Sequence, residues 1–364
     1  MEKQNKARIE WVDIAKGIGI LLVLAGHAPR DIMRDRYPLI DFGYYFIYTF
    51  HMSLFFFLSG WMFSRCQAEK KTSVQFLSGK INTLLIPWVV FSALIYLLIY
   101  GVNAVSFIKD MLYGTFLEQM GVAEYAKLCL SGMNPYCIHL WYMYTLFFVQ
   151  IIIFMLCRIY RKATKHPEIS RRFQWLLMGA AVVLFIGMPD ELPILANIGS
   201  YTMYFAWGMT GPQDFGNRRF LTGLIPGTLI CAVNVLAVNM NGVGSAAFRT
   251  VIYYFCAFVG VPLMIVGLCA LAKYLEGKSR RLQWLGRNSF GIYLLHQPFA
   301  CAVPGTVLVR LLPLNIVSCL GIMAVCMASS VVFPYVVVRI AGRMRLEKMF
   351  QVLLGVKKME KFPW

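Results

Sequence analysis

The sequence contains few acidic residues: Asp and Glu make up 17 of its 364 residues, against 35 Lys and Arg. Charged residues of all kinds are 14% of the chain, whereas hydrophobic residues are 59%. Since soluble globular domains carry about 25% charged residues, this composition excludes that class and predicts an all-α, polytopic membrane protein. The ten cysteines lack the spacing of a metal site, and we expect them to be small buried side chains rather than a disulfide framework.

Long apolar runs divide the chain into about ten candidate transmembrane helices. The runs lie at about residues 11–29, 43–63, 84–102, 137–157, 173–188, 194–210, 220–239, 248–272, from 288 onward with interruptions at Pro298 and Pro304, and at 314–338. The sequence shows neither an internal repeat nor a stretch long enough for an extramembrane domain. We therefore expect a single transmembrane domain over residues 1–364, with a basic cytosolic tail at about 339–364.

The positive charges are distributed unevenly between the two sets of loops. If the N-terminus is cytosolic, the segments on that side hold several-fold more Lys and Arg than the segments outside. This bias predicts that both termini are cytosolic, an N-in and C-in arrangement. It also accounts for most of the net charge of +18, so we expect membrane lipids and no nucleic acid among the partners.

The most informative run is 11–29, WVDIAKGIGILLVLAGHAP, because it places ionisable residues inside an apolar helix. Such groups are costly in a membrane. Lys16 and His27 are eleven residues apart, which puts them on one helix face about 16 Å apart along the axis, and Asp13 can pair with Lys16 across one turn. This pattern favours a path for an elongated anionic molecule. The alternative is that Lys16 extends to the cytosolic headgroups and His27 is an interfacial residue without chemistry.

Three other histidines, His51, His139 and His296, lie in or at the ends of apolar runs. Histidine is the side chain best suited to proton transfer near neutral pH. Taken one at a time, however, each of these three is expected to form a hydrogen bond between helices. The histidines include no pair four residues apart and have no carboxylate nearby in the sequence, so we expect no metal site.

The second run contains FFFLSG, in which Ser59 and Gly60 follow three phenylalanines and a leucine. Small residues here let another helix pack closely, or let a ligand approach the backbone with the Ser59 hydroxyl as a hydrogen-bond donor; the sequence supports both interpretations equally. The sequence favours a role as nucleophile for Ser59 less than either of these, because no G-x-S-x-G motif surrounds it. Arg65 follows at the cytosolic end, where it serves the positive-inside bias or binds phosphate in a bidentate manner.

Aromatic and polar residues mark the fourth and ninth runs. Trp141 and Tyr142 are expected to belong to the interfacial aromatic belt, with stacking on a sugar ring as the alternative. Asn288 and Ser289 are typical of a helix start, with Ser289 as the cap. His296 lies two residues before Pro298, and a proline there weakens the helix and favours a buried polar cavity beside the histidine.

Four motifs, in this order and spacing, resemble those of the acyltransferase 3 family: WVDIAKGIGILLVLAGH, FHMSLFFFLSG, HLWYMYTLFF and LGRNSFGIYLLHQP. Members of this family are integral-membrane proteins that move acyl groups, usually acetyl, onto carbohydrates. The sequence is most similar to the compact bacterial sugar O-acetyltransferases without an attached hydrolase-like domain. The resemblance spans nearly the whole chain and implies a multi-pass protein of the bacterial cytoplasmic membrane.

The resemblance implies that cytosolic acyl-CoA, most commonly acetyl-CoA, is the co-substrate, with no bound cofactor. The implied acceptor is a sugar hydroxyl on a lipid carrier, an oligosaccharide or an envelope polymer. The resemblance also implies His27 as the catalytic residue; the family often has an arginine where this sequence has Lys16, which keeps a cation for phosphate but lacks the guanidinium fork. The expected donor-binding residues are Lys16, Asp13, Ser59, Gly60 and Arg65, and the expected acceptor or pocket residues are His51, Trp141, Tyr142 and His296.

Two reaction routes and two function classes remain open at this point. Neutral His27 accepts the proton of the acceptor hydroxyl as it attacks the thioester, or it forms a covalent acyl-histidine. A transporter or flippase for a glycan or lipid-linked sugar is the alternative class, because many spans, intramembrane polar groups and broken helices also suit it. The shared face of Lys16 and His27 favours the enzyme. The sequence specifies neither the acceptor sugar nor the oligomeric state.

Overall fold

The structure is a computed structural model that describes residues 9–112, 120–131, 134, 136–166, 168–187, 193–211, 215, 220–240 and 244–343. Within these residues the chain is helical and contains no strand, which confirms the all-α prediction. The predicted basic tail lies outside the described residues from residue 344 onward.

The helices are numbered in chain order, and the prediction of a single domain stays a prediction. In the first half they are α1 (Glu10–His27), α2 (Asp31–Arg36), α3 (Pro38–Arg65), η1 (Ala68–Lys70), α4 (Ser73–Lys80), η2 (Ile81–Leu85), α5 (Ile86–Ala104), α6 (Ser106–Leu112), α7 (Val122–Ser131), η3 (Ile138–Leu140) and α8 (Trp141–Thr164). In the second half they are α9 (Arg171–Gly187), α10 (Pro193–Thr210), α11 (Phe220–Asn234), η4 (Val235–Met240), α12 (Ala246–Phe255), η5 (Cys256–Gly260), α13 (Val261–Tyr274), α14 (Arg280–Leu295), η6 (His296–Ala300), α15 (Ala302–Leu311) and α16 (Ile316–Arg343).

Among the described residues, seven helical segments are long and apolar enough to cross a membrane. They are Pro38–Arg65, Ser73–Ala104, Ile138–Thr164, Phe220–Met240, Ala246–Tyr274, Arg280–Leu311 and Ile316–Ala341. The other three predicted spans also coincide with helices, namely α1, α9 and α10, but α9 has only 17 residues and α1 carries three charged side chains. The protein is therefore a multi-pass membrane protein, and the count of ten spans and the N-in, C-in orientation stay predictions.

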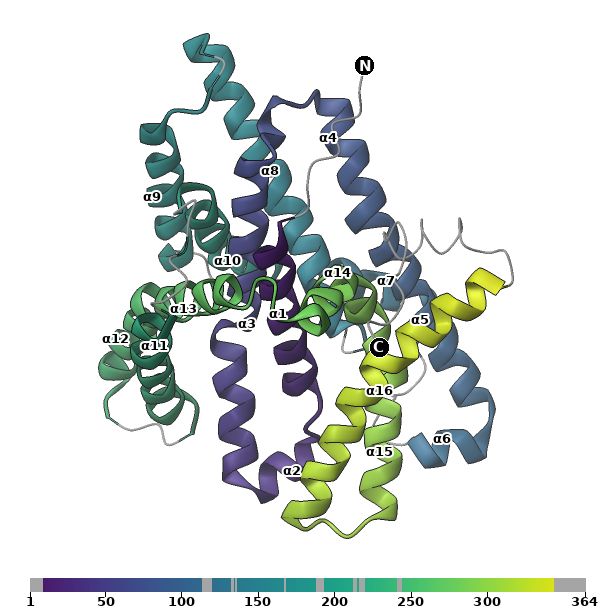
Figure 1. Cartoon of the computed structure of the whole chain (residues 1–364). Helices are drawn as coiled ribbons and strands as arrows, with labels where there is room; N and C mark the ends of the chain where they lie inside the picture. The colour runs from purple at the N-terminus through teal and green to yellow at the C-terminus, as the bar shows by residue number, and fades with distance from the viewer. Residues whose placement is uncertain are drawn as a thin grey trace.

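Helix α1 lies in the middle of the bundle, where it packs against α3, α13, α14 and α16 (Figure 1). Helices α9, α11 and α12 lie on one side of it, and α5 and α6 lie on the other (Figure 1). The first turn of α1 is held by the loop after α13, since the Trp11 N–H donates to Glu276 Oε1 at 3.1 Å. The Gly277 N–H likewise donates to Glu10 Oε1 at 2.7 Å. The charged start of α1 is thus anchored to protein.

Two glycines set the rotation of α1 against α14. A methyl group on Gly17 would overlap the Leu282 carbonyl. A methyl group on Gly286 would overlap the Asp13 carbonyl on the other helix. The two backbones are therefore in direct contact, as small residues allow in membrane helix pairs. This contact fixes which face of α1 is turned toward the rest of the bundle.

Candidate active site

One face of α1 borders a cavity inside the bundle. Lys16, Ile20 and Val23 follow one another at helical spacing on this face, and all three line the cavity. The other walls come from α3, α8 and α14 through Met52, Phe55, Ser59, Tyr142, Ser289, Phe290 and Tyr293. The volume of this space, which we call the Lys16 cavity, is about 160 Å³.

His27 lies one turn beyond Val23 on the same helix face, as the spacing predicts. Its ring centroid is 5.1 Å from that of His296, and its Nδ1 is 3.4 Å from Tyr48 Oη. The Cys301 thiol donates to the His27 carbonyl at 3.2 Å. His27 is therefore turned toward α3 and η6, and its place at the end of α1 is fixed by the segment after η6.

The four histidines of the apolar runs converge on one place, which we call the histidine cluster: His27, His51, His139 and His296. The His139 and His296 rings are 5.6 Å apart between centroids. Tyr48, which contacts His27, has its ring 4.9 Å from that of His51. The sequence predicts separate structural roles for three of these histidines, whereas the fold brings all four together. Within the described part of the chain, His, Cys, Asp and Glu side chains form no group of three that would hold a metal ion.

Backbone carbonyls fix the proton position on two rings of the histidine cluster. His51 Nδ1 donates to the Ile47 carbonyl at 2.8 Å. His296 Nδ1 donates to the Tyr293 carbonyl at 2.6 Å. A carbonyl only accepts, so in the neutral ring Nδ1 carries the proton and Nε2 holds a lone pair. Nε2 of His139 and Nε2 of His296 are buried and have no hydrogen-bond partner among the described residues. For His296, whose Nδ1 carries the proton, this leaves Nε2 as a proton acceptor in an apolar interior.

At the start of α1, the acidic residue that the sequence pairs with Lys16 has a partner on another helix. Asp13 Oδ2 forms an ion pair with Arg287 Nε on α14 at 3.2 Å. Both side chains are largely buried, so the pair is a fixed contact between α1 and α14 rather than a surface ion pair. Arg287 thus adds a second cation beside the start of α1, on a helix that also lines the Lys16 cavity. The LGRNSF segment contains this arginine, but the sequence does not reveal its partner.

The structure separates the two small residues of FFFLSG. Ser59 lines the Lys16 cavity. Gly60 faces α10 instead, where a methyl group would overlap the Phe205 carbonyl. Of the two interpretations of this motif, ligand approach fits Ser59 and close helix packing fits Gly60. Arg65, at the end of α3, is exposed.

Trp141 and Tyr142 point into the bundle. Tyr142 is only 8% exposed and lines the Lys16 cavity, with its ring 5.7 Å from that of Tyr293. Trp141 is half-buried and packs on Tyr201, with ring centroids 4.9 Å apart. The prediction of an aromatic belt is therefore wrong for Tyr142, because a belt residue faces the lipid headgroups.

The break predicted in the ninth run is present, but the predicted helix start is wrong. Helix α14 ends at Leu295, and Gln297 has an extended backbone with φ −113° and ψ 142°. This break places His296 at the turn where the chain leaves the helix. Ser289 lies well inside α14, which begins at Arg280. The local capping pattern at Ser289 was overridden because α14 packs along α1 over most of its length.

A basic depression of about 640 Å³ lies at the end of α8 and beside η1. Its charged lining consists of Lys70, Lys71, Arg158, Arg161, Lys162 and Lys165, and His166 lies beside them. Arg161 Nη1 donates to the Glu69 carbonyl at 2.8 Å, and this hydrogen bond joins the end of α8 to η1. The end of α8 and the start of α1 point to the same side of the bundle (Figure 1). So dense a group of cations favours phosphate-bearing molecules on that side.

Residues 9–337 match a family model described as an acyltransferase domain, that of acyltransferase 3. The match covers nearly the whole chain and includes all four motifs from which the resemblance was drawn. No curated protein and no solved structure matches the chain. The resemblance predicted from the motifs is confirmed.

Proposed function

Because this chain belongs to the acyltransferase 3 family and is a multi-pass membrane acyltransferase, we propose that it transfers an acyl group from cytosolic acyl-CoA to a sugar hydroxyl. In this proposal acetyl-CoA is the donor, the acceptor is a cell-envelope or lipid-linked sugar, and the membrane is the bacterial cytoplasmic membrane. The observation that carries the proposal is one face of α1. Lys16 and Val23 line the Lys16 cavity on this face, and His27 follows one turn later, with its ring beside that of His296.

The Lys16 cavity is too small for a whole nucleotide. Its volume of about 160 Å³ is below the range of about 300–1,000 Å³ that is typical of small-molecule sites. We therefore assign to it the thin pantetheine arm and the thioester, with the nucleotide left at the cytosolic surface. An extended arm spans the roughly 16 Å between Lys16 and His27.

Cations on the cytosolic side account for recognition of the donor phosphates in this proposal. Lys16 stands at the start of the Lys16 cavity and offers an ammonium group to a phosphate. The basic depression at the end of α8 raises the local concentration of a polyanion such as acyl-CoA. Arg287 is bound to Asp13, so its role in this scheme is to hold α14 against α1.

The reaction requires the acceptor hydroxyl to lose one proton. In the proposed step, neutral His27 takes that proton at Nε2 while the hydroxyl oxygen bonds to the thioester carbonyl carbon. The carbon–sulfur bond then breaks, and the departing thiolate of CoA takes the proton back from His27. For Nε2 to accept, Nδ1 must carry the hydrogen, and the 3.4 Å contact with Tyr48 Oη gives that hydrogen an acceptor. Tyr48 is thus a positioning residue in this scheme.

Thioester consumption tests the proposal directly. Protein purified in detergent is incubated with acetyl-CoA, and the free thiol that appears is measured with and without an extract of envelope glycans. We expect slow hydrolysis in water and faster release with the acceptor, whereas a transporter consumes no thioester. Mass spectrometry of envelope glycans from cells with and without the protein then identifies the acylated hydroxyl. Unchanged thioester together with unchanged glycans would refute the proposal.

The same assay separates direct transfer from the acyl-histidine route. A covalent intermediate adds the mass of one acyl group to the protein when acetyl-CoA is supplied without acceptor. Direct transfer leaves the protein mass unchanged under the same conditions. Intact-protein mass spectrometry after rapid acid quench distinguishes the two outcomes.

A further inference from the structure

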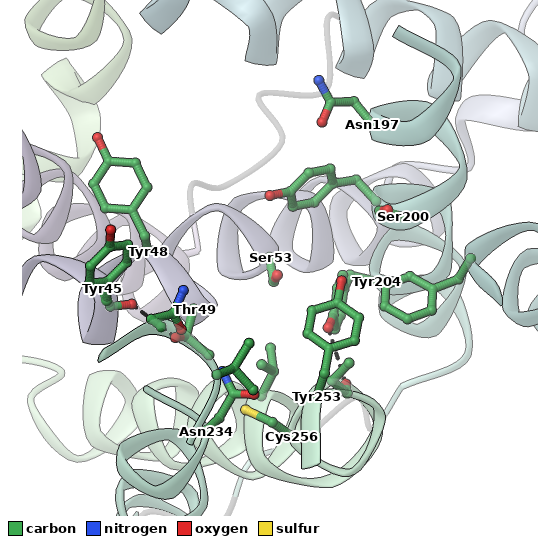
Figure 2. A pocket seen from close by; sticks show the side chains of 16 residues that line it. Tyr45, Tyr48, Thr49, Ser53, Asn197, Ser200, Tyr204, Asn234, Tyr253 and Cys256 are labelled. Carbon is green, nitrogen blue, oxygen red and sulfur yellow. Dashed lines mark hydrogen bonds between the residues drawn. The ribbon is translucent and has the colours of Figure 1, made fainter. Parts of the chain in front are cut away.

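A second cavity borders α3 on another of its faces, and Figure 2 shows its lining. Its volume is about 360 Å³, within the size range of small-molecule sites. Its walls come from α3, α10, the end of α11 with η4, and α12 with η5. The polar lining includes Tyr48, Ser53, Asn197, Tyr204, Asn234 and Tyr253. We call this space the tyrosine cavity.

The tyrosine cavity carries no formal charge. None of its described lining residues is Lys, Arg, Asp or Glu, whereas the Lys16 cavity and the basic depression both offer cations. A phosphate or carboxylate would enter this interior without a counter-charge, which is costly. Aromatic faces combined with amide and hydroxyl groups instead suit an uncharged molecule that carries many hydroxyls. A neutral sugar unit has this chemistry.

Asn234 gives a second, independent indication of a ligand. Its side chain is 5% exposed and lines the tyrosine cavity, yet its Oδ1 has no hydrogen-bond partner within the described residues. A buried amide oxygen without a donor is unfavourable, and native proteins rarely leave one. A sugar hydroxyl in the cavity would supply the missing donor. By contrast, Tyr204 already donates its hydroxyl to the Ala257 carbonyl at 3.1 Å (Figure 2).

Tyr48 joins the tyrosine cavity to the histidine cluster. It lines the cavity, and its Oη is 3.4 Å from His27 Nδ1. Its ring is also 4.9 Å from that of His51. A sugar beside Tyr48 therefore lies close to the His27 ring, whose Nε2 takes the hydroxyl proton in the proposed reaction.

The two cavities border different parts of α3. On α3, Met52 and Phe55 line the Lys16 cavity, whereas Thr49 and Ser53 line the tyrosine cavity. The tyrosine cavity draws mainly on the first half of α3, through Tyr45, Tyr48 and Thr49, and this half follows the His27 end of α1 through the short helix α2. The Lys16 cavity instead extends back toward the start of α1. The tyrosine cavity thus lies in the half of the bundle away from the charged start of α1.

We propose that the tyrosine cavity binds the acceptor as a neutral sugar unit and presents its hydroxyl to His27 from the side opposite to acyl-CoA. This assignment rests on the proposed acyl transfer: the sugar oxygen loses its proton to His27 and bonds to the acyl carbon, and CoA leaves as the thiol. With the N-terminus cytosolic, as the charge bias predicts, the acceptor enters from the outer half of the membrane.

The test removes the buried amide and leaves the donor side intact. Asn234→Leu replaces it by an apolar group of similar size. In host cells that carry only this variant, we expect ester-linked acyl groups on envelope glycans to fall by about tenfold or more, since one buried hydrogen bond is lost. The native acceptor is present in these cells whatever its identity. The purified variant in detergent should still hydrolyse acetyl-CoA in water at the wild-type rate and with the wild-type KM.

Two further variants make the result specific. Ser200→Phe places a large side chain from α10 in the tyrosine cavity. It should also lower glycan acylation and leave thioester hydrolysis at the wild-type rate, so it can replace Asn234→Leu if that variant does not fold. Asn103→Leu is the matched control, because its amide lies on α5 and donates to the Ile99 carbonyl at 2.9 Å. Asn103→Leu should leave both readouts unchanged. Folding is checked by size-exclusion chromatography and thermal melting in detergent.

Each outcome decides the assignment. Wild-type glycan acylation in folded Asn234→Leu and Ser200→Phe overturns it. An equal fall in glycan acylation and thioester hydrolysis also overturns it, because these residues would then serve the donor or the fold. If the wild-type protein neither consumes thioester nor changes the glycans, the proposed function itself fails, and the sugar site fails with it.

Discussion

The Lys16 cavity and the tyrosine cavity border the same helix, α3, but they differ in charge and in volume. The first is about 160 Å³ and has a lysine in its wall. The second is about 360 Å³, and its described lining offers hydroxyls and amides without a formal charge. In a low-dielectric interior a fixed charge discriminates strongly between anionic and neutral ligands. This difference matches the proposed reaction, in which the donor carries anionic phosphates and the acceptor is a neutral sugar.

The largest effect is expected at His27. His27→Ala removes the proposed proton acceptor, so we expect acyl transfer to glycans to fall by about 10²–10⁴-fold. The variant should remain folded in membranes, as judged by its size-exclusion profile in detergent. Asn103→Leu, on α5 and outside the lining of both cavities, is the control and should keep wild-type transfer. Full transfer activity in His27→Ala would show that His27 is not the proton acceptor of the reaction.

A smaller effect, confined to the donor side, is expected at Lys16. Lys16→Ala should raise the KM for acetyl-CoA by about tenfold, because one charge-assisted contact is lost, with less change in kcat. Lys16→Arg should restore the KM, since it keeps the cation. Both constants are measured by thiol release at saturating acceptor. A KM for acetyl-CoA that does not change in Lys16→Ala would count against a donor path along α1.

Substitutions of Ser59 and Gly60 test whether the first residue lines the Lys16 cavity and the second one packs against α10. Gly60→Ala places a methyl group against the Phe205 carbonyl, so it should destabilise the protein by about 1–3 kcal/mol and lower the melting temperature in detergent. Ser59→Ala removes a hydroxyl from the Lys16 cavity and should change the KM for acetyl-CoA only a few-fold, at wild-type stability. Equal melting temperatures for the two variants would contradict this division of roles.

The smallest effect is expected at the exposed end of α3. Arg65 is exposed, and many exposed ion pairs contribute nothing measurable. Arg65→Ala should therefore change the KM for acetyl-CoA less than about twofold. Arg158→Ala, in the basic depression, is the comparison variant in the same kinetic assay. A larger effect of Arg65→Ala than of Arg158→Ala would place the nucleotide at the end of α3 rather than at the end of α8.

The helices were predictable from the sequence to a large extent, because apolar runs and helical spacing are local properties. The positions of all ten predicted spans coincide with helices, and Lys16, Ile20 and Val23 share one face as their spacing predicts. The start of α14 was not predictable from its local pattern. Ser289 has the chemistry of a cap, but packing along α1 extends the helix back to Arg280.

The contacts between helices were the part that the sequence left open. In a membrane, an apolar face that meets lipid and an apolar face that meets protein have the same composition. Tyr142 therefore had the pattern of a belt residue, although it is buried against Tyr293. For the same reason nothing in the sequence paired Asp13 with Arg287.

The sequence by itself determined that this protein is a multi-pass, all-helical membrane protein, that Lys16 and His27 lie on one face of the first helix, and that the chain belongs to its family. The tertiary structure alone decided that His27, His51, His139 and His296 gather in one place and that α3 separates a charged cavity from a neutral one. The physical reason is that spacing along a helix fixes the face of a side chain, whereas its neighbours across the bundle depend on how the helices pack.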